Sequence, residues 1–171
     1  MRFPLLLPVT AFGLAFVCLC AYAVDNLRIV KITELHQSDS YDLQAARAWK
    51  LPEQIDFTIE ELPVIEGDYL QVGGWLSNAS PAPQRVVVFP VGNLGFYVNP
   101  ITGTAKNLGP LLPMPAPPPP LLLTLPALSR TRLTTTLKLS DWEWDKQKPK
   151  EIEWSFLFWN EPKPRGRMTI P

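Results

Sequence analysis

Few side chains in this sequence combine the types and spacing that catalysis requires. The only histidine, His36, lies in a polar stretch, and both cysteines, Cys18 and Cys20, fall within an apolar N-terminal run. A histidine without a nucleophile or a second imidazole beside it is typical of a solvated surface residue rather than a base or a metal ligand. We therefore expect no metal centre and no bound cofactor.

Two pairs of carboxylates, Glu60 with Glu61 and Glu143 with Asp145, have the chemistry for general acid and base work. The sequence places neither pair across a cleft, and acidic residues at turns and on outward strand positions are ordinarily solvated. Ser140 lacks the flanking glycines of a nucleophile elbow. The sequence thus predicts a protein that is not an enzyme.

Aromatic residues are the first candidates for binding. Trp142 and Trp144 alternate with acidic residues near an expected turn, where their rings could contact a sugar or a partner protein. The competing interpretation is packing at the rim of the core, which is commoner for tryptophan. Trp154 differs from them, because it shares the register of Ile152 and Phe156 and is expected inside the core.

Proline is the second candidate, since the chain holds 20 prolines in 171 residues and concentrates them between positions 110 and 126. Polyproline II is the expected conformation there, and a central strand is not expected because proline lacks the N–H donor. Such helices dock into aromatic grooves, so the segment is a candidate ligand. The interpretation that we favour is a stiff crossover between sheets, with Leu121 to Leu123 covering the edge of the core. The densest run comprises Pro117, Pro118, Pro119 and Pro120.

The N-terminus carries the features of an export signal. Arg2 precedes an apolar core over 9–19, and the small residues Ala21 and Ala23 follow. This order predicts a signal peptide over 1–23 that is cleaved after export, which places the protein outside the cell or in a periplasm. An uncleaved membrane anchor and lipidation of a cysteine are the alternatives.

Charge and length narrow the class of protein. Sixteen basic and sixteen acidic residues give a formal net charge of zero, which excludes the basic footprint of a nucleic-acid binder. Removal of the signal leaves a chain of single-domain length without cysteine, so a disulfide-free domain is expected.

Alternating apolar and polar residues predict about seven strands, separated by turn residues. Asp39 to Trp49 is the only expected helix, and 27–32 is an eighth strand candidate. The glycine pair Gly73 and Gly74 predicts a bulge or a close backbone approach within its strand. Asn78 opens a glycosylation sequon that is expected on an exposed turn. The seven strands are expected at 55–60, 69–76, 85–89, 95–98, 133–139, 152–158 and 167–170.

This succession predicts an all-β fold, an antiparallel β-sandwich with a short N-terminal helix. Residues 24–52 would form an N-terminal extension and 53–171 the domain, with 110–126 as the crossover. Strand count and order over about 53–171 are similar to those of single immunoglobulin-like domains of secreted proteins. The cysteine pair of antibody domains is missing.

The expected function is an exported, non-catalytic binding or envelope-structural module whose partner is a protein. The alternatives are a carbohydrate-binding module that uses Trp142 and Trp144, and a protease inhibitor that presents a loop around 113–120. No nucleic-acid partner is expected. Contact with a membrane is expected only through an uncleaved or lipidated N-terminus.

Overall fold

The computed structural model describes residues 27–37, 47–90, 92–106, 119–159, 161 and 164–170. Strands make up most of these residues, which confirms the all-β class. The expected signal over 1–23 lies outside them with both cysteines, as does most of the expected helix, of which only Arg47 and Ala48 are described as helical. Within the described ranges, none of the helices has the length and apolar character that a bilayer span requires.

The largest sheet has the order β1, β10, β5, β3, and β4 pairs with β5 on the same edge as β3. β5 and β10 are antiparallel and pair without interruption from Tyr69↔Lys138 to Asn78↔Ser129, so the glycine pair forms no bulge. β1 pairs with β10 in parallel, which departs from the all-antiparallel prediction. The strands span β1 Arg28–Ile29, β3 Ile55–Thr58, β4 Val64–Glu66, β5 Tyr69–Asn78 and β10 Ser129–Lys138.

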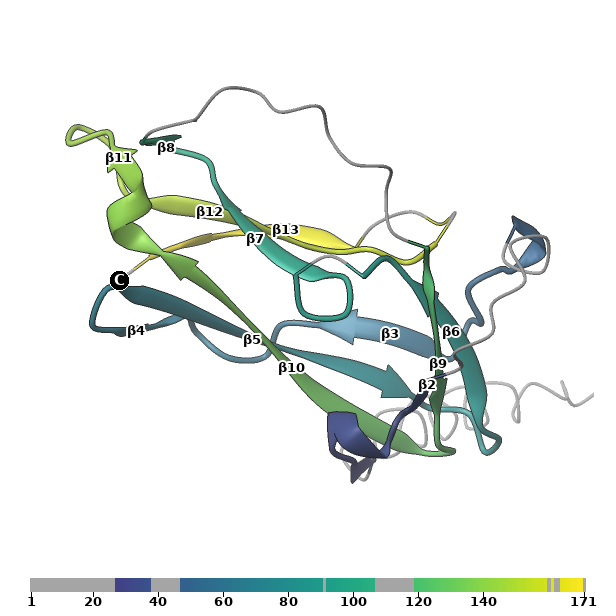
Figure 1. Ribbon diagram of the computed structural model, residues 1–171. Coiled ribbons are helices and arrows are strands. Elements are labelled where there is room, and N and C mark those ends of the chain that lie inside the picture. Colours follow the sequence, from purple (N-terminus) through teal and green to yellow (C-terminus); the bar gives the residue numbers. More distant parts are fainter. Residues whose placement is uncertain are drawn as a thin grey trace, which may run out of the picture.

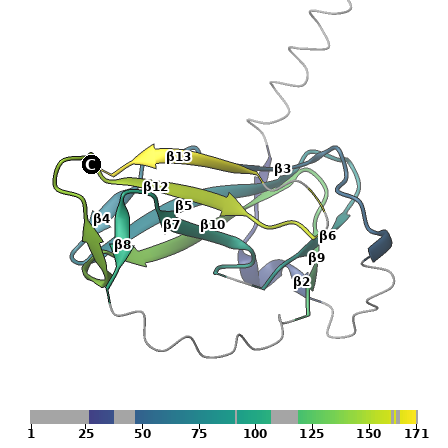
Figure 2. The same cartoon turned by 90° about the horizontal axis from the view of Figure 1, so that it is seen from above.

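A second sheet, in the order β13, β12, β7, faces the first (Figures 1 and 2). A third, in the order β2, β9, β6, lies at one end of the molecule, and a two-stranded ribbon of β8 and β11 lies at the other (Figure 1). The remaining elements are β2 His36–Gln37, β6 Gln84–Val88, β7 Phe96–Pro100, β8 Gly103–Ala105, β9 Leu121–Leu125, β11 Trp142–Trp144, β12 Glu151–Phe156, β13 Arg165–Thr169 and the 3-10 helices η1 Ile32–Glu34 and η2 Leu139–Asp141.

Aromatic rings join the two facing sheets. Phe57 of β3 stacks on Phe156 of β12 with their ring centroids 4.3 Å apart, and it lies 4.9 Å from Phe96 of β7. Gly74 of β5 makes room for this ring, because a Cβ at that position would come within 2.3 Å of Phe57 Cζ. The glycine pair was expected to mark a bulge or a close backbone approach, and the structure instead shows a side-chain ring packed against Gly74. Fully buried aliphatic residues around the rings include Leu70, Val72, Leu76, Leu123, Leu125 and Leu133.

The end of the proline segment differs from the prediction. Leu121–Leu125 form β9, the central strand of its sheet, with β2 on one side and β6 on the other. The expectation of no central strand up to residue 126 is wrong here because these five residues contain no proline and keep every N–H donor. Residues 107–118 lie outside the described ranges.

Asn78 is fully buried instead of standing on an exposed turn. Its side-chain amide donates to the carbonyl oxygens of Ala82 (3.1 Å), Leu125 (3.3 Å) and Pro126 (2.8 Å), and its Oδ1 accepts from the N–H of Ser80 (2.9 Å). The sequon asparagine thus links the end of β5 to the β9–β10 turn. A glycan has no access to this amide in the folded protein.

Trp142 and Trp144 belong to a strand, not to a turn, because β11 pairs with β8 from Trp142↔Ala105 to Trp144↔Gly103. Trp154 is half-buried against the core rather than fully inside it. Its ring covers Gly166 of the edge strand β13, where a Cβ would come within 2.7 Å of the indole nitrogen.

Candidate functional site

The carboxylates of Glu60 and Glu61 hold a loop onto the outer face of the large sheet. Arg130 Nη1 lies 3.1 Å from Glu60 Oε2, and Arg132 forms an ion pair with Glu61 through two donors. The Arg130 guanidinium also covers the ring of Trp75, 4.2 Å from its centroid. Carboxylates engaged in this way have a structural role, and they do not form an acid and base pair across a cleft.

Ser140 is also engaged in local structure. Its N–H donates to Asp68 Oδ1 at 2.9 Å, and its hydroxyl donates to Asp68 Oδ2. These bonds attach η2 to the β4–β5 turn. Among the described residues, no group of three or more histidine, cysteine, aspartate or glutamate side chains could hold a metal ion.

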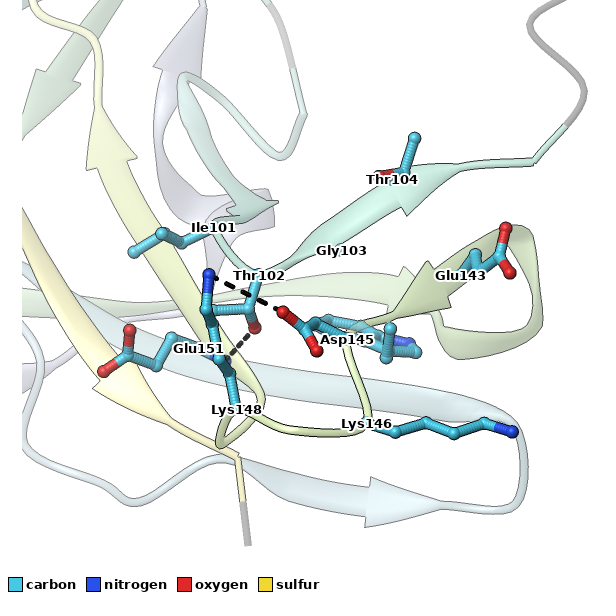
Figure 3. A pocket seen from close by; sticks show the side chains of 10 residues that line it. Ile101, Thr102, Gly103, Thr104, Glu143, Asp145, Lys146, Lys148 and Glu151 are labelled. Carbon is cyan, nitrogen blue, oxygen red and sulfur yellow. Dashed lines mark hydrogen bonds and ion pairs between the residues drawn. The ribbon is translucent and has the colours of Figure 1, made fainter.

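Glu143 and Asp145 border an open hollow of about 790 Å³ beside the β8–β11 ribbon (Figure 3). Asp145 Oδ1 accepts from the N–H of Gln147 at 2.9 Å, and its Oδ2 lies 3.6 Å from Lys148 Nζ. Both signs of charge therefore meet at this hollow. Its lining comprises Ile101, Thr102, Gly103, Thr104, Glu143, Trp144, Asp145, Lys146, Lys148 and Glu151.

Of the two candidate tryptophans, Trp144 lines the hollow and Trp142 does not. The indole N–H of Trp144 donates to the carbonyl of Leu139 at 3.3 Å, and its ring lies on Gly103, where a Cβ would meet Cε3 at 3.3 Å. Lys150 Nζ lies 5.9 Å from the ring centroid. Both tryptophans are partly buried, so neither presents a fully open ring face.

The other predicted site residues fall in different places. Pro117 and Pro118 lie outside the described residues, whereas Pro119 is exposed and Pro120 is buried. His36 lies in β2, where its backbone pairs with that of Thr124 in β9. Of the described prolines, neither Pro119 nor Pro120 lines the hollow beside Trp144.

Sequence reasoning missed a cluster of exposed apolar side chains on the β4–β5 hairpin, which we call the hairpin patch. Leu62 is 86% exposed, Val64 54%, Tyr69 48% and Ile65 38%. A signal was present, because Gly67 and Asp68 between two short apolar runs are typical of a two-residue hairpin turn. Gly67 adopts a φ of +60°, as such a turn requires.

The chain matches no protein-family model, and comparisons with curated proteins and with solved structures give no significant match.

Proposed function

We propose that this chain is an exported, non-catalytic binding module of immunoglobulin-like β-sandwich type whose partner is a protein. The hairpin patch carries this proposal, because Leu62, Val64, Ile65 and Tyr69 expose apolar surface within eight residues of chain. Gathered apolar surface on a soluble domain is typical of a protein interface, whereas single exposed apolar residues are normal.

The strand alternation defines which face of the sheet the patch occupies. Leu70 and Val72 are fully buried on the inner face, so Tyr69 and Gln71 point to the outer face. Val64 lies opposite Gln71 and shares that outer face. An aromatic ring and an aliphatic side chain on one open face form a contact surface of the kind that protein interfaces favour.

The experiment measures the size of the complex that the exported protein forms in its native compartment and compares the unmodified protein with single-residue variants. Leu62→Ser and Tyr69→Ser should each release the protein to the size of the free chain, because hot-spot contacts concentrate in large apolar side chains. Leu128→Ser is the matched control, since Leu128 is 46% exposed but lies in the β9–β10 turn. A complex that survives both hairpin substitutions would contradict the proposal.

A carbohydrate is the second candidate ligand, and the hollow beside Trp144 is the observation that favours it. Sugar recognition combines an aromatic platform with polar side chains, and Trp144, Glu143 and Thr104 line the same space. Retention on polysaccharide resins tests this candidate. Loss of retention in Trp144→Ala with an unchanged melting curve would support it, and absence of retention by the unmodified protein would eliminate it.

The proposal of export is supported by sequence features, and the proposal of a sandwich is supported by the two facing sheets. The signal over 1–23 supports export, and the face-to-face packing of Phe57 on Phe156 and Phe96 supports a sandwich. The protease-inhibitor alternative depends on the loop around 113–120, nearly all of which lies outside the described residues.

A further inference from the structure

Backbone hydrogen bonding identifies the outward groups of β4. The N–H of Ala79 donates to Gln54 O at 2.9 Å, so the odd-numbered residues of β5 bond toward the edge that β3 and β4 share. Bonding alternates along an antiparallel pair, so Tyr69 and Gln71 bond to their β4 partners Glu66 and Val64. Ile65, between those two, turns its N–H and C=O away from β5. No partner for these two groups exists among the described residues.

Local contacts engage two other strand edges in the described part of the chain. On β3, the N–H of Ile55 donates to Pro52 O (3.0 Å) and that of Phe57 to Asp56 Oδ1 (2.8 Å). Beside β6, the N–H of Trp159 donates to Val87 O at 2.9 Å. The two outward N–H donors of β3 are therefore already engaged.

The edge of β13 is guarded in a different way. The N–H of Phe156 donates to Pro164 O and that of Ile170 to Lys150 O, so Arg165 and Arg167 turn their backbone groups outward. Both arginine side chains are exposed. Charged side chains are a usual protection of a free edge against pairing, and β4 lacks any basic side chain.

A carboxylate without an ionic partner stands at the end of β4. Glu66 Oε2 accepts from Gln71 Nε2 at 2.6 Å, and no basic side chain pairs with it among the described residues. Glu60 and Glu61, in contrast, are both neutralised by arginines. The hairpin patch therefore combines apolar side chains with a negative charge that only the neutral Gln71 amide contacts.

We propose that β4 accepts an extended segment of the partner protein as an added strand, hydrogen-bonded to Ile65, with apolar side chains and a lysine or arginine beside Glu66. This inference rests on the proposed function and specifies how the partner binds. Main-chain bonds from an added strand supply affinity, and alternate side chains supply specificity. The partner's inward side chain would extend the core beside Ile65, which lies opposite the buried Leu70.

The probe for this mode is a synthetic ten-residue peptide with blocked ends, valine at every second position, and lysine and threonine between the valines. Its binding to the full chain is measured by fluorescence anisotropy. We expect it to bind at least tenfold more tightly than the same peptide with glutamate in place of lysine, and than one with a central proline. The substitution Glu66→Gln should reduce the lysine preference at least threefold, whereas Glu53→Gln, an exposed carboxylate near the other end of β3, should leave it unchanged.

Two substitutions at one position separate backbone pairing from side-chain contact. Ile65→Pro removes the outward N–H without touching the bonds to β5, and Ile65→Ala removes most of the side chain but keeps the N–H. We expect at least a tenfold loss of peptide affinity for Ile65→Pro and a smaller loss for Ile65→Ala. If Ile65→Pro fails to fold, the exchange rate of the Ile65 amide proton in the unmodified protein should fall at least tenfold when the peptide binds.

Several outcomes would overturn the inference while leaving the proposed function intact. Equal losses for Ile65→Pro and Ile65→Ala, or an unprotected Ile65 amide, would show a patch that binds without strand addition. Absence of peptide binding, combined with a native complex that Leu62→Ser still disrupts, would show a partner of another shape. Concentration-dependent dimers that Ile65→Pro abolishes would assign the edge to a second copy of this chain.

Discussion

The ring of Phe57 lies against the main chain of Gly74 on the neighbouring strand, so closely that a Cβ at position 74 would come within 2.3 Å of the ring. The same ring stacks on Phe156 of the opposite sheet. Phe57 therefore spans the core between the two layers, and its position depends on the absence of a side chain at Gly74.

Gly74→Ala should destabilise the protein by about 1–3 kcal/mol, because the added methyl group displaces a ring that is fixed between two sheets. Denaturant unfolding measures the change. Gly73→Ala is the matched control on the same strand, where the new Cβ would meet only the flexible ends of Arg132 and Glu61 at 3.1 Å. Equal losses at the two glycines would contradict this account of the core.

Asn78→Asp should cost at least about 2 kcal/mol, because it replaces a buried donor by a carboxylate that faces carbonyl oxygens. The matched control is Asn99→Asp on β7, where the side chain is exposed and the change should be close to neutral. Thermal melts of both variants measure the difference. An unchanged melting curve for Asn78→Asp would mean that the amide does not organise this end of the sheet.

Strand positions could be predicted from the sequence wherever apolar residues alternate over a long enough run. The expected strands at 55–60 and 152–158 correspond to β3 and β12, because each has apolar residues on one face. The short strands β4, β8 and β11 were missed, since three residues carry too little alternation to be distinguished from a turn. β4 is a strand because it pairs with β5, and β8 and β11 are strands because they pair with each other.

Less of the candidate site could be predicted from the sequence. Trp144 was expected near a turn, but its exposure depends on pairing with Gly103, which lies far away along the chain. The sequence does not reveal the hairpin patch as a surface, because valine and isoleucine such as Val64 and Ile65 are residue types that usually lie in the core. Only the position of β4 at a sheet edge leaves them in contact with solvent. Residue types set the chemistry here, and long-range pairing decides which side chains are accessible.

Arg130 and Arg132 should differ in their effect on stability. Arg130→Ala should cost about 1–2 kcal/mol, because that side chain is only 22% exposed and its guanidinium covers the ring of Trp75. Arg132→Ala should cost less than about 1 kcal/mol, since its ion pair with Glu61 is exposed to solvent. Denaturant unfolding followed by tryptophan fluorescence measures the stability of both variants. A larger loss of stability for Arg132→Ala than for Arg130→Ala would contradict this ranking.

The exported protein should begin at Val24, because Ala21 and Ala23 form the expected cleavage site. Intact mass together with N-terminal sequencing of the protein recovered after export identifies the first residue. Replacing Ala23 by a bulky residue should leave the precursor uncleaved, and replacing Ala11 within the apolar core is the control. A product that retains Met1, or that begins at a lipidated Cys20, would refute cleavage at this site.

Site-specific photo-crosslinking tests protein binding at the hairpin patch most directly. A photoreactive amino acid at position 62 and one at position 128 both replace exposed leucines, but only the first lies in the patch. After export and irradiation, position 62 should give one discrete protein adduct that Val64→Asp abolishes, and position 128 should give none. The same adducts from both positions, or none from position 62 in folded and exported protein, would contradict the claim that this hairpin binds a protein partner.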